Sequence, residues 1–120
     1  MTERLSALDA SFLYLESPTT AMHVGSVARF TPPAGEPFDY DAFCALVARR
    51  ISLVPRYRQK LKFVPGRLAN PIWVDDEDFD ITYHVRRSAL PKPGDDGQLR
   101  ALVGRLQGRP LDRARPLWEI

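Results

Sequence analysis

Residues 39–54 read "DYDAFCALVARRISLV", and this stretch decides the fold class because its apolar residues recur with the period of a helix. Asp39 is placed to cap the first turn, and Phe38 and Phe43 have the spacing of a hydrophobic staple. Pro55 disfavours helix at the residue before it, so the helix ends or kinks there. We expect this helix to lay one apolar stripe on a sheet. The stripe consists of Phe43, Leu46, Val47, Ile51 and Val54.

Two more helices are predicted on either side of this one. The first begins at Ser6, whose hydroxyl can cap the free amides, with Asp9 three residues later in the capping-box position. Leucine or phenylalanine at positions 8, 12 and 15 then falls on one side of it. The other helix has apolar residues at positions 99, 102, 103 and 106 and stops near Gly108.

Strands are predicted from extended apolar runs bounded by turn residues. The stretch 22–30, "MHVGSVARF", has this character, and Gly25 within it indicates a bulge or a close backbone approach. Residues 61–64, 71–75 and 81–87 follow as short strands of a meander, and residues 117–120 as an incipient strand. The sequence therefore predicts an α/β (α+β) fold, with a mixed β-sheet packed by about three helices, in a single domain over residues 1–120.

Composition limits the class of protein and its compartment. The chain has 120 residues, 44% of them hydrophobic and 27% charged, which suits one globular domain. No apolar stretch approaches the roughly 20 residues of a membrane helix, and the first residues lack the apolar region of a secretory signal. The lone Cys44 offers no disulfide framework, so we expect a reducing, cytoplasmic setting.

Charge is distributed unevenly along the chain. The stretch 49–67 carries seven basic and no acidic residues, whereas residues 75–80, "DDEDFD", are almost wholly acidic. Such asymmetry can mark a face for phosphates or anionic lipid, or it can be a solvated surface. The candidates for contact with a phosphate or a membrane surface are Arg56, Arg58, Lys60 and Lys62. No nucleic-acid-binding pattern is present, so nucleic acid is not an expected partner.

Candidate catalytic residues are few. His23 and His84 are the only neutral-pH bases, and a strand histidine without a partner is more often structural than catalytic. Cys44 follows the apolar Phe43 in a helix, which favours core packing over a nucleophile. An EF-hand loop starting at Asp75 fails at its required glycine and glutamate, so no metal site is predicted. Phosphate-loop, dinucleotide-binding and serine-hydrolase motifs are also missing.

Three segments together resemble one family. They are "LSALDASFLYLESPTTAMHVGSVARF" at 5–30, "ANPIWVDDEDFDITYHVRRSALPKPG" at 69–94 and "RPLDRARPLWEI" at 109–120. In this order they resemble the N-terminal part of bacterial wax ester synthase/diacylglycerol acyltransferases. The resemblance implies the fold of coenzyme A-dependent acyltransferases, which has two similar α/β halves with the active site in a tunnel between them.

The same resemblance implies transfer of an acyl group from acyl-CoA to diacylglycerol or a long-chain alcohol, with acyl-CoA as a substrate and no cofactor. The family's catalytic motif, HHxxxDG, follows its Pro-Leu-Trp segment, and its second histidine acts as the general base. This chain has no adjacent histidines, and neither His23 nor His84 matches the motif. We therefore expect the motif beyond residue 120, and no catalytic residue and no transfer activity in the chain alone.

Pro116, Leu117 and Trp118 match a tripeptide that the family retains. Trp118 either lines the acyl channel or fixes the catalytic strand, and plain core packing is the simpler interpretation because large aromatic residues mostly serve burial. Asp112 with Arg113 and Arg115 is expected to form an ion-pair lock around this loop.

The expected partners also follow from the resemblance. They are acyl-CoA and a lipid acceptor in the full-length enzyme, the missing C-terminal remainder or a second copy, and peripheral contact with the inner membrane or lipid droplets. An alternative from another class is a non-catalytic binding or scaffold domain derived from the same family. The acceptor and the preferred acyl chain cannot be predicted from these residues.

Overall fold

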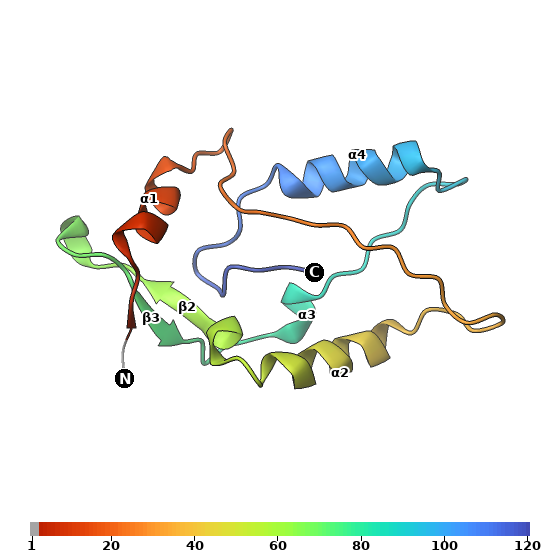
Figure 1. Cartoon of the computed structure of the whole chain (residues 1–120), viewed down its shortest axis with the longest axis horizontal. Helices are drawn as coiled ribbons and strands as arrows, with labels where there is room; N and C mark the ends of the chain where they lie inside the picture. Colours follow the sequence, from red (N-terminus) through yellow and green to blue (C-terminus); the bar gives the residue numbers. More distant parts are fainter. Residues whose placement is uncertain (1–2) are drawn as a thin grey trace.

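The structure is a computed structural model, and it describes residues 3–120. Helices and short strands follow one another along the chain, so the predicted α/β class is confirmed (Figure 1). In chain order the elements are β1 (Glu3–Arg4), α1 (Ala7–Leu15), α2 (Tyr40–Ile51), η1 (Pro55–Arg58), β2 (Gln59–Lys62), η2 (Pro65–Arg67), β3 (Ile72–Asp75), α3 (Ile81–His84) and α4 (Asp96–Gln107).

The sheet has the strand order β1-β3-β2. Leu61 of β2 pairs with Trp73 of β3, and Glu3 of β1 pairs with Trp73 on the other side. The predicted meander of residues 61–64 and 71–75 is confirmed, with β2 beginning two residues earlier than expected. Both pairings are antiparallel, so within residues 3–120 the sheet is not the mixed sheet that the sequence predicted.

All three predicted helices form, and the two N-terminal caps that the sequence indicates, Ser6 and Asp39, are present. The Ser6 hydroxyl accepts the amide of Asp9 at 3.1 Å, and the Asp39 carboxylate accepts the amide of Ala42 at 3.0 Å. The staple predicted at the start of α2 is present, because the rings of Phe38 and Phe43 lie 5.8 Å apart. These helices begin where side-chain oxygens satisfy amides that have no partner within the helix.

The strand predicted at residues 81–87 is wrong, because Ile81–His84 form the helical turn α3. Asp80 caps this turn by accepting both the amide of Thr82 at 2.9 Å and its hydroxyl at 2.7 Å. The two hydrogen bonds from Thr82 hold the pKa of Asp80 below its usual value. A local cap therefore overrides the apolar alternation that favoured a strand.

The strand predicted at residues 22–30 is also wrong, because this segment is extended but belongs to no sheet in the described chain. It runs beside α4 instead (Figure 1). Gln107 donates to the carbonyl of His23 at 3.3 Å, and Arg29 pairs with Asp96 at 3.0 Å. The neighbour of Gly25 is a side chain and not the backbone that the sequence predicted, since a Cβ there would meet Oε1 of Gln107 at 2.0 Å.

The incipient strand predicted at residues 117–120 is not a sheet strand within residues 3–120. Its last residue is nevertheless paired with a neighbouring segment. The Ile120 amide donates to the His84 carbonyl at 2.7 Å, and the Arg86 amide donates to the Ile120 carbonyl at 2.8 Å. Ile120 thus bonds through its backbone to His84 and Arg86, which flank Val85, and this is the hydrogen-bond pattern of two parallel strands.

The described core consists of two small clusters. In the first, α2 packs on the α3 region through Cys44, Val47 and Ile51, with Val85 opposite them. The second contains Leu5, Ala10 and Leu61, between α1 and the sheet. The stripe of α2 therefore packs on α3 and not on the sheet as predicted, and its members Leu46 and Val54 remain 40% and 46% exposed. The predicted core position of Cys44 is confirmed.

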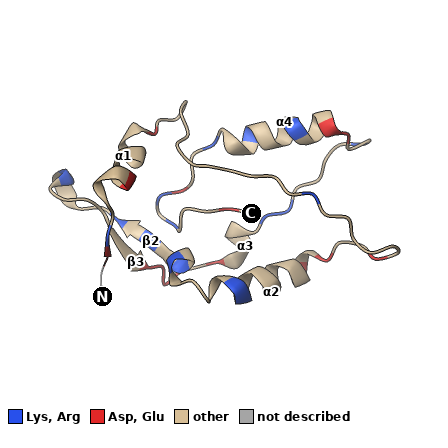
Figure 2. Cartoon of the chain, viewed as in Figure 1, with Lys and Arg blue, Asp and Glu red and all other residues tan. Residues whose placement is uncertain are grey.

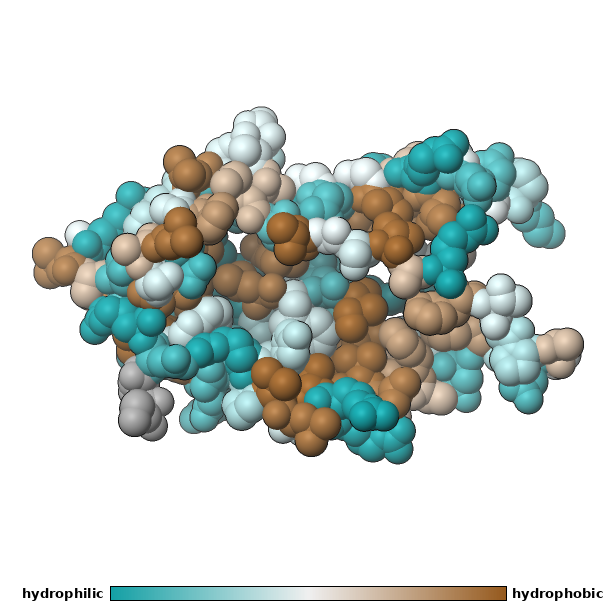
Figure 3. Space-filling view, viewed as in Figure 1, coloured by the Kyte–Doolittle hydropathy of each residue, from teal (hydrophilic) through white to brown (hydrophobic). Residues whose placement is uncertain are grey.

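Much apolar surface remains uncovered (Figure 3). The accessible surface is 9267 Å², about 40% more than the roughly 6,600 Å² expected of a folded monomer of this mass. Leu8 and Leu15, on the side of α1 away from the core, are 70% and 65% exposed, and Val24 is 97% exposed. Among residues 3–120, no helix combines the length and apolarity that a bilayer-spanning segment requires.

Candidate functional site

Residues 109–120 cross the molecule between the two core clusters and join them (Figure 1). Pro116 is buried in the described chain. Leu117 packs against the cluster of Leu5, Ala10 and Leu61, whereas Trp118 packs against the cluster that α2 forms with Val85. Leu117 lies at a bend, where the Trp118 amide bonds back to the Pro116 carbonyl, and from this tight turn the neighbouring side chains reach different clusters.

Trp118 has a partner for each of its polar groups. Its indole N–H donates to the carbonyl of Tyr57 at 2.8 Å, and its backbone amide donates to the carbonyl of Pro116 at 2.9 Å. Its carbonyl oxygen lies 2.7 Å from Nδ1 of His84. The indole also meets the ring of Tyr57 edge-on, with centroids 5.9 Å apart. Trp118 is thus fixed in position through both its side chain and its backbone.

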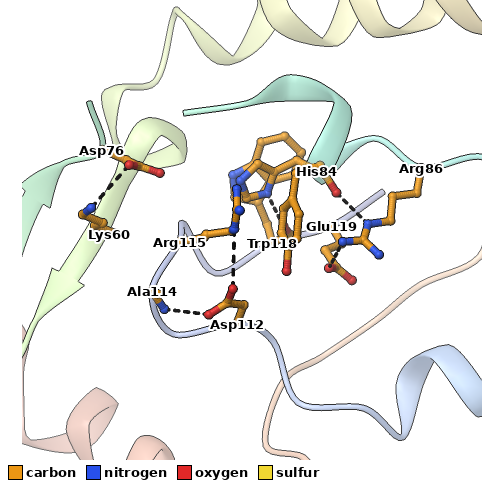
Figure 4. Close-up of polar contacts among 10 residues, drawn as sticks. Lys60, Asp76, His84, Arg86, Asp112, Ala114, Arg115, Trp118 and Glu119 are labelled. Atoms are coloured by element: carbon orange, nitrogen blue, oxygen red, sulfur yellow. Dashed lines mark hydrogen bonds and ion pairs between the residues drawn. The ribbon is translucent and has the colours of Figure 1, made fainter. Parts of the chain in front are cut away.

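His84 lies beside Trp118 and is fully buried (Figure 4). Its ring stacks on Trp118, at 4.5 Å between centroids, and on Phe79, at 5.1 Å, and these two rings also lie 6.3 Å from each other. A carbonyl oxygen only accepts hydrogen bonds, so the contact with Trp118 requires a proton on Nδ1 of His84. In the neutral ring Nε2 then carries a lone pair, and it has no hydrogen-bond partner among the described residues.

The residues after Trp118 are held by the same part of the chain. Ile120 bonds through its backbone to His84 and Arg86, and Arg86 also pairs with Glu119 at 3.9 Å. The hydroxyl of Tyr40 in α2 donates to the carbonyl of Val85, which ties this arrangement to the helix. Its hydrogen bond with the Cys44 thiol, together with burial, raises the pKa of the Tyr40 hydroxyl.

The ion-pair lock predicted around residue 112 is confirmed in part. Arg115 lies 3.5 Å from the carboxylate of Asp112, and its guanidinium stacks 4.0 Å from the centre of the Tyr83 ring. Arg113 instead reaches α1, where it bonds to the carbonyl of Leu13 and pairs with Glu16 at 3.3 Å. The loop is therefore closed by the Asp112–Arg115 pair and is also tied to α1 and to Tyr83 of α3.

The basic residues predicted to meet phosphates or lipid lie on η1 and β2 and do not form one open patch (Figure 2). Arg56 pairs with Glu3 and stacks 4.4 Å above Trp73. Lys60 lies 3.4 Å from the carboxylate of Asp76, whose side chain is only 4% exposed. Arg58 stacks 4.9 Å above Phe79, and neither it nor Lys62 has an acidic partner in the described chain.

Two open hollows adjoin these residues and share Asp76. One is lined by Ser52, Pro55, Arg58, Asp75 and Asp76, and the other by Lys60, Asp76, Asp78, Asp112, Ala114 and Arg115. Carboxylates outnumber basic side chains in each lining, three to two in the second. This balance disfavours a phosphate group in either hollow.

Within residues 3–120, no histidine, cysteine or serine forms the nucleophile and base pair of covalent catalysis. His23 has an unpartnered Nδ1 in this part of the chain, and no set of three potential ligands there is arranged to hold a metal ion.

The contact of His84 with Trp118 was not predicted from the sequence, because the two residues are 34 positions apart. The sequence signal was the aromatic pattern of Phe79 and Tyr83 around this histidine.

Comparison with known proteins places these features in one family. The model of the wax ester synthase/diacylglycerol acyltransferase catalytic domain matches residues 5–120. The "Probable diacyglycerol O-acyltransferase tgs3" of Mycobacterium tuberculosis is 53% identical over 120 residues, which are 100% of this chain and 44% of that protein. The tgs1 protein of the same organism, with the same description, is 42% identical over 97% of this chain and 25% of its own length.

A solved structure gives the same result. The wax ester synthase/diacylglycerol acyltransferase from Marinobacter aquaeolei VT8 matches with a TM-score of 0.79 and 36% sequence identity. The match covers 97% of this chain and 29% of that chain. This chain therefore spans less than half the length of each of these relatives.

Proposed function

We propose, since the chain belongs to the wax ester synthase/diacylglycerol acyltransferase family, that it forms part of an enzyme that transfers an acyl group from acyl-CoA to an alcohol. The resemblance predicted from three segments of the sequence is confirmed by this membership. The acceptor that we propose is diacylglycerol or a long-chain alcohol, which gives triacylglycerol or a wax ester. Acyl-CoA enters as a substrate, and no cofactor is proposed.

The observation that carries this proposal is the match of residues 5–120 to the family's catalytic domain. The reaction needs a base that takes the proton from the acceptor hydroxyl as its oxygen attacks the thioester. His84 is unsuited to that role, because its Nδ1 is bonded to a carbonyl and its ring is 0% exposed. We propose that the base lies in a His-His motif outside these 120 residues, which contain no adjacent histidines.

In this proposal the chain holds the 109–120 segment in place and takes no part in proton transfer. Pro116, Leu117 and Trp118 hold residues 109–120 between the two clusters. Substrate and catalytic groups must be held in near-attack geometry, and a rigid supporting segment supplies part of that constraint. The packing and hydrogen bonds of Trp118 support this structural role over a place in an open acyl channel.

Peripheral contact with an anionic membrane or lipid droplet belongs to the same proposal, because the acceptors dissolve in lipid. Arg58 and Lys62 have no acidic partner in the described chain, and in this proposal their side chains contact the anionic surface. Arg56 and Lys60 are already paired, so they contribute less. We propose weak, salt-sensitive binding at this surface, on a cytoplasmic protein.

A non-catalytic scaffold is the second candidate, favoured by one observation: the 120 residues hold no adjacent histidines. The experiment that separates the two uses the natural polypeptide that carries this sequence, at its full encoded length. It is incubated with labelled acyl-CoA and either diacylglycerol or a long-chain alcohol. The proposal predicts labelled ester with at least one acceptor, in equal amount to released coenzyme A. Absence of ester with both acceptors supports the scaffold.

A further inference from the structure

We propose that His84 is a positioning residue for acyl transfer, which fixes residues 116–120 through its Nδ1–H hydrogen bond to Trp118. This inference rests on the acyltransferase function proposed above. His84 does not exchange a proton with substrate. It acts through Trp118, by holding the backbone of the segment that joins the two core clusters.

The arrangement is built around the imidazole on several sides. Phe79 and Trp118 lie nearly parallel to it, with interplanar angles of 13° and 23°, their own centroids are 6.3 Å apart, and Tyr83 meets it edge-on at 80°. The backbone of His84 takes part as well, because its carbonyl accepts the amide of Ile120 at 2.7 Å. One residue therefore holds the 116–120 segment at two points, Trp118 and Ile120; Figure 4 shows His84 beside Trp118.

The choice of histidine at this position calls for an explanation beyond packing. A phenylalanine would fill the space beside Phe79 and Trp118, and it would bring no buried nitrogen that lacks a partner. Burying such a nitrogen without a hydrogen bond opposes folding. The feature that imidazole adds is the Nδ1–H donor, which is aimed at the Trp118 carbonyl at 2.7 Å. The geometry points to that hydrogen bond as the reason for a histidine here.

Loss of the donor is expected to affect rate more than fold. The stacking and the other bonds of Trp118, to Tyr57 and Pro116, remain when His84 becomes Phe. The Trp118 carbonyl is then free to move, and so is the backbone that continues to Ile120. A displacement of about 1 Å in supporting structure can cost on the order of 100-fold in rate.

The test uses three variants of the natural polypeptide at its full encoded length. In His84→Asn the side-chain amide nitrogen takes the place of Nδ1 and restores the donor. His84→Gln places its amide near Nε2 and serves as the matched control, and His84→Phe keeps only the stacking. We expect kcat to fall roughly 10- to 100-fold in the Phe and Gln variants. We also expect an unchanged KM for acyl-CoA, a modest and similar loss of thermal stability in the Phe and Gln variants, and recovery of most of the kcat in the Asn variant.

A kcat near wild type in His84→Phe, or equal losses in the Asn and Gln variants that follow their thermal stability, would overturn the inference. If a variant fails to fold, ¹⁵N NMR of the unmodified chain still decides, because the inference requires a protonated Nδ1 on His84. The opposite tautomer overturns it. If the unmodified full-length polypeptide makes no ester at all, the acyltransferase proposal fails together with this one, whereas an active enzyme indifferent to His84→Phe removes only the claim on His84.

Discussion

Replacing Trp118 with alanine is expected to destabilise the chain strongly, because Trp118 joins residues 109–120 to the cluster that α2 forms with Val85. The change removes the indole hydrogen bond to Tyr57, worth about 0.5–1.5 kcal/mol, and the stack on His84, worth a similar amount. Burial of roughly 100 Å² of side-chain surface adds about 2.5 kcal/mol. The total agrees with the loss of about 3–5 kcal/mol that such substitutions cause in cores.

Trp118→Phe is a milder variant at the same position. It keeps the stack on His84 and most of the buried side-chain surface, and it loses the indole N–H donor. Its expected cost is about 1–2 kcal/mol. Urea unfolding followed by far-UV circular dichroism measures both variants without depending on tryptophan fluorescence. With a slope of about 2 kcal/mol per molar urea, the phenylalanine variant should unfold at roughly 0.5–1 M less urea and the alanine variant at roughly 1.5–2.5 M less.

Val24→Ala is the matched control, because Val24 is apolar but 97% exposed. Its expected change in unfolding free energy is within about 0.5 kcal/mol. If Trp118→Ala shifts the urea midpoint no more than Val24→Ala does, then Trp118 does not join the two clusters, and the structural role of residues 116–118 is refuted.

Three more predictions concern other parts of the chain. Because the folded-state pKa of Asp80 is lowered, its contribution to stability is present above its unfolded pKa of about 3.9 and is lost as pH falls through the folded value. Asp80→Asn should therefore lower the melting temperature at pH 7, and the difference from wild type should shrink towards pH 3; a pH-independent difference would contradict this. The thiol of Cys44 is buried, so it should react with a soluble disulfide reagent only after unfolding, and immediate reaction in native buffer would show that α2 is not packed as described. Anionic vesicles should bind the chain weakly at low salt and release it at high salt, with most of the binding lost in the Arg58→Gln, Lys62→Gln double variant; binding unchanged by salt or by these changes means that the surface has no such ligand.

The local features of the fold could be predicted from the sequence. Asp39 and the Phe38–Phe43 pair define the start of α2 within a few residues, and the cap and the staple formed as expected. The prediction failed where a local bond competes with a pattern. Ile81, Tyr83 and Val85 alternate like a strand, but the Asp80 side chain bonds to Thr82 and starts a helical turn instead.

Long-range features were harder to predict. Residues 22–30 have strand composition, yet a strand needs a neighbour, and among the described residues this segment meets the side chains of α4. At the candidate site, Pro116 to Trp118 were identified through a family resemblance. The part played by His84 depends on a hydrogen bond across 34 positions, which no local spacing reveals.

The most direct test of the account compares ester formation by the 120-residue chain and by the natural polypeptide at its full encoded length, under the same conditions. Labelled acyl-CoA is the donor, and diacylglycerol or a long-chain alcohol is the acceptor. The account predicts ester from the full-length polypeptide and none from the 120-residue chain, because the chain positions Trp118 and contains no His-His motif to supply the base. Turnover by the 120-residue chain that His23→Ala or His84→Ala abolishes would contradict it, as would a full-length polypeptide that forms no ester with either acceptor.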